Sequence, residues 1–290
     1  MSRDGASGGG ANPGGTTPDA GRGRRGGRAH APWPLLVLGG LAFAFLVLPL
    51  LAIVARAPWG RLLSVLGDGP VLQALVLSMR TASLATLVGL VVGVPLAWLL
   101  ARGGLRGTGV VRALVTLPMV LPPVVGGVAL LSLLGRRGIV GQWLHQWFGL
   151  SIPFTTAAVV LAQAFVALPF LVLSVDGALR GLDRGQEDVA RTLGASEWTV
   201  FRRITLPRLA PAIGAGAVLC FARALGEFGA TITFAGNFPG TTRTMPIAIY
   251  LAMQQDPAAA LTMSVLLMTI CAVVLVLLRS HWLTALGRTG

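Results

Sequence analysis

Six long runs of apolar residues constrain this chain more than any other feature. Each is close to the ~20 residues that a helix needs to cross a hydrocarbon core about 30 Å thick. A helix is required because unpaired backbone amides are costly in lipid. The runs lie at residues 35–55, 82–101 (with an alternative start near Val71), 110–134, 156–179, 209–235 and 258–278. We therefore predict an all-α membrane protein with six transmembrane helices.

The composition supports a membrane environment. Apolar residues make up 54% of the chain and charged residues 11%, whereas a soluble domain needs more polar surface to cover its core. All 23 cationic side chains are arginines, and the net charge is +13. A basic chain can bind nucleic acid, but these arginines lie between apolar runs, where membrane topology explains them. We expect a lipid bilayer around the chain and no nucleic-acid partner.

The arginines are distributed unequally between the two sides of the membrane. If the amino terminus is cytoplasmic, 16 arginines lie in cytoplasmic segments and five in external segments, while Arg80 and Arg223 lie in or near spans. Cytoplasmic loops carry such an excess. We therefore predict a multi-pass protein of the cytoplasmic membrane with both termini in the cytoplasm.

The chain begins with a Gly- and Arg-rich segment, residues 1–31. Such a segment buries too little apolar surface to become ordered, so we expect a disordered cytoplasmic tail followed by one six-helix domain at 32–285. A removable secretory or twin-arginine signal is the alternative, because basic residues precede the first apolar run. That run has 21 residues, which is long for a signal and suits a span. The apolar stretch 245–255 is too short to cross, and we expect it to be interfacial or re-entrant.

The loop at residues 180–207, on the predicted cytoplasmic side, carries signals for two short helices. Asp183 suits the N-cap of the first helix, and Gly194 suits the position after its end. Ser196 suits the N-cap of a second helix, which should end by Pro207. Apolar side chains exposed on such a loop usually mark a protein contact; a loop lying on lipid headgroups is the alternative.

The same loop resembles a known motif. Asp188-Val189-Ala190, then Gly194, then Ile204-Thr205-Leu206-Pro207 are similar to the EAA loop of bacterial binding-protein-dependent ABC importers. The family pattern is Glu-Ala-Ala, three residues, Gly, nine residues, Ile, one residue, Leu-Pro. This chain has Asp for Glu and Val for the first Ala, and Glu187 lies one position early, where it could share the acidic role.

The resemblance implies a type I ABC importer transmembrane-domain fold. In that fold, the loop forms coupling helices that dock on a separate ATPase subunit. The residues that would couple to the ATPase are Glu187, Asp188, Val189, Ala190, Leu193, Gly194, Trp198, Phe201, Ile204, Leu206 and Pro207.

The residue content independently favours a separate ATPase. A Walker A loop needs a lysine to hold the phosphates, and this chain has none. The three histidines, His30, His145 and His281, are too far apart in sequence to suggest a local metal site, and no activated nucleophile stands out. We therefore assign no catalytic residue, metal or cofactor to the chain and expect it not to be an enzyme.

A second resemblance narrows the family to the molybdate/tungstate permeases and, less closely, the sulfate/thiosulfate permeases. It is carried by residues 117–127, 134–138, 222–231, 235–240 and 244–246. It implies import of molybdate or tungstate, with sulfate or thiosulfate as the alternative. It also implies a second copy of this chain, two copies of the ATPase and an external oxyanion-binding protein.

Arg223 and Glu227 lie four residues apart in the fifth predicted span. Ionisable residues in a span usually face the bundle interior, and these two can pair with each other; we favour a structural ion pair over direct substrate contact. An ion-coupled secondary transporter would need a buried carboxylate, and Glu227 beside Arg223 is the only candidate in the predicted spans, which disfavours this class. The residues proposed for the translocation path or gate are Arg223, Gly226, Glu227, Gly229 and Thr231.

Overall fold

The computed structural model describes residues 32–104 and 107–286, with side chains described as far as residue 276. By internal contacts the chain divides into two units, residues 1–49 and 50–290, and each is described by itself. Every regular element in the described ranges is a helix, which confirms the all-α prediction. The predicted tail, residues 1–31, lies outside the described residues.

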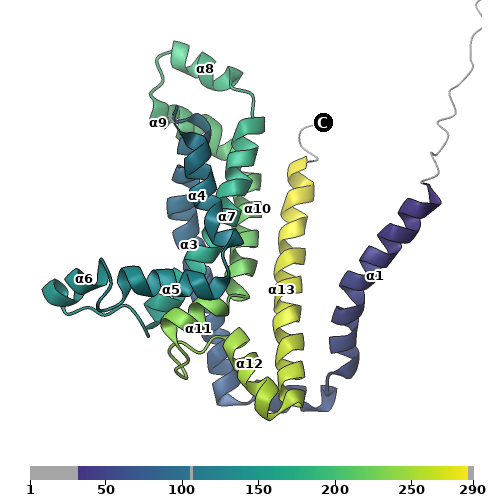
Figure 1. Ribbon diagram of the computed structural model, residues 1–290. Coiled ribbons are helices and arrows are strands. Elements are labelled where there is room, and N and C mark those ends of the chain that lie inside the picture. Colours follow the sequence, from purple (N-terminus) through teal and green to yellow (C-terminus); the bar gives the residue numbers. More distant parts are fainter. Residues whose placement is uncertain (1–31, 105–106, 287–290) are drawn as a thin grey trace, which may run out of the picture. The chain divides into compact units, whose positions relative to one another are not determined.

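The described residues form the following helical segments in chain order, most of which Figure 1 labels. They are α1 (Trp33–Arg56), η1 (Trp59–Arg61), α2 (Leu62–Leu66), α3 (Gly69–Arg102), α4 (Thr108–Val120), α5 (Pro123–Leu134), α6 (Gly141–Phe148), α7 (Thr156–Gly181), α8 (Gly185–Thr192), α9 (Glu197–Val200), η2 (Phe201–Thr205), α10 (Leu206–Leu225), α11 (Gly229–Ala235), α12 (Met245–Gln255) and α13 (Pro257–Leu286). In the described part of the chain, five helical segments are long and apolar enough to cross a membrane, or six if α4 and α5 form one bent span. The chain is therefore a multi-pass membrane protein.

The described part of the first unit is the beginning of α1. Its large apolar side chains are exposed, among them Phe43 at 68% and Phe45 at 78%. A helix that is hydrophobic all round must be surrounded by lipid or protein. The 24 residues of α1 are enough to cross a membrane, in agreement with the first predicted span.

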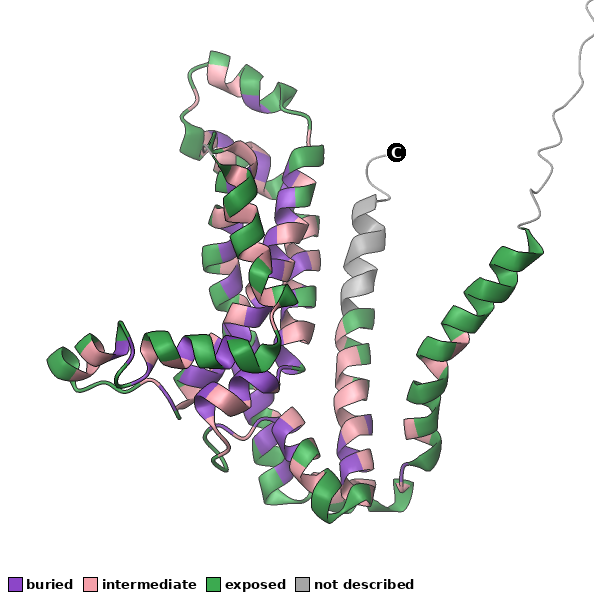
Figure 2. Ribbon diagram, in the orientation of Figure 1, coloured by how far each residue is buried: buried purple, intermediate pink, exposed green. Residues whose placement is uncertain are grey.

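The core of the second unit is the packing of α3 and α10 on α7. Figure 2 shows buried residues concentrated along these helices. Their backbones approach closely because small residues lie at the contacts. A Cβ atom at Gly93 of α3 would lie 2.8 Å from Leu171 Cδ2, and one at Gly216 of α10 would lie 3.2 Å from Leu171 Cα. Leu171 of α7 is thus enclosed from both sides.

The third predicted span is not one straight helix. Instead, α4 and α5 meet at an angle of 115°, so the prediction of a single helix over 110–134 was wrong. Leu121 has extended backbone angles, φ −64° and ψ 137°. A residue before proline is disfavoured in the helical region, and both Pro122 and Pro123 lack the amide hydrogen that would continue the ladder.

The fifth predicted span is also interrupted. The helix α10 ends at Leu225, and the short helix α11 begins at Gly229, so the single helix predicted over 209–235 was wrong as well. The two short helices after the breaks, α5 and α11, pack against each other. A Cβ atom at Gly229 would lie 2.8 Å from Pro123 Cβ, and one at Gly127 would lie 2.7 Å from Thr233 Cβ.

The remaining helices agree with the predicted pattern but differ in length. The helix α3 has 34 residues and begins near the alternative start of the second predicted span. The helix α12 has 11 residues, too few to cross a bilayer, as predicted for 245–255. Figure 1 shows α8 and α9 at one end of the α3, α7 and α10 bundle and α12 toward the other end.

Candidate functional site

The clearest candidate site is the two-helix loop, residues 182–205, which contains α8, α9 and η2. Between its helices Gly194 has φ +84°, a left-handed conformation that favours glycine. The Ala195 amide donates to Ala190 O at 3.0 Å, as expected after a helix that ends at a left-handed residue. Ser196 Oγ accepts from the Thr199 amide at 3.3 Å, so the predicted N-cap of the second helix is confirmed.

Two predicted boundaries of this loop were wrong. Asp183 is not the N-cap of α8, because that position is Arg184; Asp183 Oδ1 instead accepts from the Gly185 amide at 3.1 Å. The second helix does not end by Pro207. It continues through the π turn η2 into α10, with Pro207 in the first turn of α10. In a regular α-helix the proline ring clashes with the carbonyl four residues earlier, and the wider π turn directly before Pro207 accommodates the ring.

Glu187 anchors α8 to the bundle. Its side chain is only 2% exposed, and its Oε2 lies 3.6 Å from Arg102 Nε at the end of α3. Its Oε1 accepts a hydrogen bond from Thr205 Oγ1 in η2 at 2.9 Å. Arg102 also donates to Leu182 O at 3.1 Å. A buried carboxylate needs such partners, so Glu187 positions the loop and does not offer its carboxylate to solvent, whereas the neighbouring Asp188 side chain is 64% exposed.

Arg191 fixes the two short helices to each other. Its Nη1 lies 2.7 Å from Asp188 Oδ1 in α8, and its Nε lies 2.7 Å from Glu197 Oε1 in α9. A second hydrogen bond joins Nη2 to Glu197 Oε2 at 3.2 Å. The hydrogen bond to Glu197 raises the pKa of the Arg191 guanidinium above its ordinary value. Forked arginine–carboxylate pairs carry geometric specificity, so α8 and α9 form one rigid piece.

Three apolar side chains of the loop face solvent. Val189 is 59% exposed, Leu193 82% and Trp198 67%; we call these three residues the docking face. Large exposed apolar side chains of this kind mark interaction surfaces. Among the other predicted coupling residues, Ala190, Phe201, Ile204 and Leu206 are half-buried, and Pro207 is exposed.

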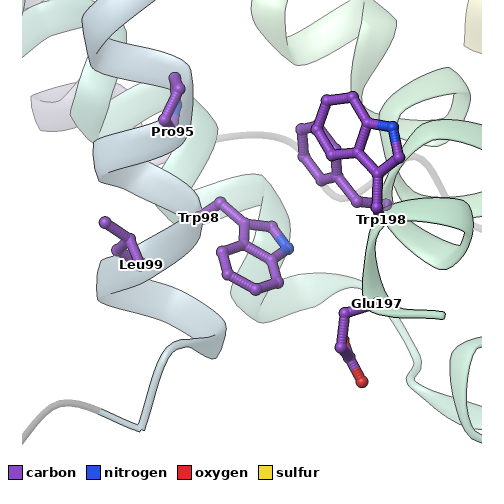
Figure 3. A pocket seen from close by; sticks show the side chains of 6 residues that line it. Pro95, Trp98, Leu99, Glu197 and Trp198 are labelled. Atoms are coloured by element: carbon purple, nitrogen blue, oxygen red, sulfur yellow. The ribbon is translucent and has the colours of Figure 1, made fainter.

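An apolar groove of about 320 Å³ lies beside the docking face. Figure 3 shows Trp198 on one side of it and Pro95, Trp98 and Leu99 of α3 on the other. Phe201 contacts both tryptophans, with ring centroids 5.8 Å from Trp198 and 6.0 Å from Trp98. Phe201 therefore joins Trp198 of the docking face to Trp98 of α3 by aromatic packing.

The candidate residues of the translocation path gather at the break between α10 and α11. Arg223 Nη1 lies 2.6 Å from Glu227 Oε2, and the Glu227 side chain is 1% exposed. Glu227 Oε1 accepts from the Ala230 amide at 2.8 Å, so Glu227 ties the end of α10 to the start of α11. This geometry supports the structural ion pair. Thr231 is fully buried.

Sequence reasoning missed a second buried carboxylate. Asp176 of α7 is fully buried, and it receives two bonds of 3.1 Å from Arg112 of α4 and one of 2.6 Å from Arg180. The statement that Glu227 is the only carboxylate in a span was therefore wrong. The available signal was the spacing of Asp176, inside the apolar run 156–179, and Arg180, four residues later and directly after that run. The cluster joins α4 to α7, and the two arginines compensate the charge of Asp176.

Comparison with known proteins gives consistent matches. Residues 89–288 match the family model described as "Binding-protein-dependent transport system inner membrane component". The chain is 50% identical to the molybdenum transport system permease protein ModB of Mycobacterium tuberculosis over 79% of this chain and 87% of that protein. It is 44% identical to ModB of Escherichia coli K12 over 76% of this chain and 96% of that protein. It is 37% identical to the E. coli sulfate transport system permease protein CysT over 77% of this chain and 82% of that protein.

A solved structure shares the fold. A bacterial ABC transporter involved in the import of the acidic polysaccharide alginate superposes with a TM-score of 0.68. The match covers 89% of this chain and 96% of that chain, at 17% sequence identity. The fold is therefore that of an ABC importer permease.

Proposed function

This chain belongs to the family of binding-protein-dependent transport system inner membrane components, and we propose that it is the membrane-spanning subunit of an ATP-driven importer of molybdate. The observation that carries the proposal is the identity of 50% and 44% to two molybdenum permeases over most of both chains. Identity to a sulfate permease is lower, at 37%. Sulfate or thiosulfate is therefore the second candidate cargo, and tungstate shares the tetrahedral shape of molybdate.

The partners follow from the same proposal. An ATPase subunit docks on Val189, Leu193 and Trp198, and an external binding protein delivers the oxyanion on the opposite side of the membrane. The complex contains two copies of this chain and two of the ATPase, with both termini of this chain in the cytoplasm. One solved structure that resembles this chain is an alginate ABC transporter in complex with a periplasmic protein, which supports this kind of assembly.

The helical connection between the docking face and the membrane supports a mechanical role. From Glu197 to Leu225 the chain runs through α9, η2 and α10 as one helical segment of 29 residues. A displacement of Trp198 by the ATPase therefore moves α10 without an intervening flexible loop. Glu187 transmits the same displacement to the end of α3 through Arg102. When two ATPase subunits close on ATP, these rods move together and open the path outward.

Uptake by reconstituted vesicles tests the function. Vesicles hold the chain and its ATPase, with ATP inside and the binding protein and labelled molybdate outside. We expect ATP-dependent uptake that an equal concentration of sulfate does not reduce. If sulfate displaces molybdate while molybdate fails to displace sulfate, the cargo assignment is wrong. Uptake that needs an ion gradient and no ATP would instead indicate a secondary transporter.

A further inference from the structure

The second unit contains an exposed arginine that the proposed function leaves unused. Arg80 lies on α3, about 33 Å along the axis from Arg102 at ~1.5 Å per residue. It lies inside α3, directly before the apolar run 82–101, on the side of that run remote from the two-helix loop. Resting on the proposed function, we propose that Arg80 contacts the tetrahedral oxyanion at the external mouth of the translocation path.

The environment of Arg80 is an open hollow of about 580 Å³. The exposed side chains of Gln73, Val76 and Arg80 lie on one face of α3. These three residues line the hollow together with Gly240. Gly240 has φ +72°, and a Cβ atom there would lie 3.4 Å from Gln73 Oε1. The turn after α11 therefore packs against α3 beside Arg80, which brings two of the chain's external segments to one site.

Three of the five arginines in the predicted external segments have side-chain partners, whereas Arg56 and Arg137, like Arg80, have none among the described residues. Arg61 pairs with Asp256 at 3.2 Å, Arg243 donates to Asn237 Oδ1 at 2.7 Å, and Arg136 contacts His145 at 3.1 Å. Within the described residues Arg80 makes no ion pair and no side-chain hydrogen bond, and no carboxylate lines its hollow. Its donors are free for an external anion.

The chemistry of this site suits a cargo that must bind and then be released. A guanidinium presents planar donors that match two oxygens of a tetrahedral oxyanion, and the Gln73 amide can supply a further donor. Because the pair would be exposed to water, its contribution to binding is small. A single exposed cation therefore attracts the anion toward the mouth and still lets it leave.

The test compares Arg80→Gln with wild type in the vesicle assay. We expect the KM for molybdate uptake to rise about two- to fivefold, as the loss of a water-exposed ion pair predicts. Arg80→Lys should fall between the two, because it keeps the charge and loses the fork. Arg56→Gln is the matched control, since Arg56 is an exposed arginine outside this hollow, and it should match wild type. Basal ATP hydrolysis by each assembled complex verifies that the variants fold.

A phospholipid headgroup offers the same chemistry as the cargo, so each variant is measured in phospholipid vesicles and in phosphate-free galactolipid vesicles. A difference between wild type and Arg80→Gln that persists in both lipids supports the inference. A difference that vanishes in galactolipid assigns Arg80 to lipid phosphate and overturns the inference. The inference is also overturned if wild type and Arg80→Gln have the same KM in each of the two lipids. Wild type that takes up no molybdate would refute the proposed function itself.

Discussion

At the scale of single residues, a buried charge holds the two-helix loop in place. Glu187 lies between the end of α3 and η2, and its partner Arg102 is 5% exposed. Removing one member of a buried pair leaves the other uncompensated, which costs more than the pair contributes. The neighbouring Asp188 also pairs with an arginine, but at the surface. Removing the Glu187 carboxylate should therefore cost more stability than removing the Asp188 carboxylate.

We predict that Glu187→Ala lowers the free energy of unfolding by about 3 kcal/mol, because Arg102 would be left buried without a carboxylate. Asp188→Ala, the matched control, should cost less than about 1 kcal/mol, because it removes an exposed pair. Thermal unfolding of the purified chain in detergent measures both. Equal losses for the two variants would contradict the anchoring role of Glu187.

Gly194 allows a test of docking that is separate from folding. A Cβ atom there meets nothing within 4 Å, but φ is +84°. Gly194→Ala should cost about 1 kcal/mol of strain and leave most transport intact. Gly194→Trp should abolish transport while membrane insertion is unchanged, because the bulky ring obstructs the docking face. Normal uptake by Gly194→Trp would argue against docking at this loop.

At the scale of elements, the two broken spans explain how short helices fit inside the bundle. The helices α5 and α11 follow their breaks and pack at Gly229 and Gly127, where each glycine replaces a side chain that would clash. Glu227, within the break, accepts a hydrogen bond from the Ala230 amide in the first turn of α11 and pairs with Arg223 of α10. The breaks are therefore stabilised features of the fold.

We predict that Gly229→Ala destabilises the chain by about 1–3 kcal/mol, as overpacking does, because its Cβ would lie 2.8 Å from Pro123 Cβ. Gly214→Ala is the control, since a Cβ atom there meets nothing within 4 Å. The melting temperature of each variant in detergent is the measurement. A Gly229→Ala protein as stable as the control would contradict the close packing of α5 on α11.

The sequence predicted the helices better than their interruptions. Apolar length located the spans, and Gly194 and Ser196 located the two short helices, because both signals are local. The breaks at Pro122 and Gly226 were missed because membrane helices often tolerate proline and glycine, and only packing against a neighbour decides the outcome. The contact of Asp176 with Arg112 could not be predicted because Arg112 lies far away in sequence, on α4, whereas Arg180 four residues away was a local signal that was overlooked.

At the scale of the whole molecule, α8, α9 and η2 form one surface at an end of the α3, α7 and α10 bundle of the second unit. Trp198 of the docking face lies on the helical segment that continues into α10, and Arg191 and Glu187 join α8 to that segment through Glu197 and Thr205. The lysine-free sequence cannot supply a Walker A motif. We propose that the energy for transport enters through an ATPase partner at this surface.

Site-specific photo-crosslinking from Leu193 tests this central claim most directly. The crosslinker replaces Leu193, the most exposed side chain of the docking face at 82%, in cells that express the complete transporter. The account predicts a covalent adduct with a nucleotide-hydrolysing subunit, whereas a crosslinker at exposed Leu63 in α2 gives none. Adducts only with lipid from position 193, or none at all in a membrane that transports molybdate, would contradict it.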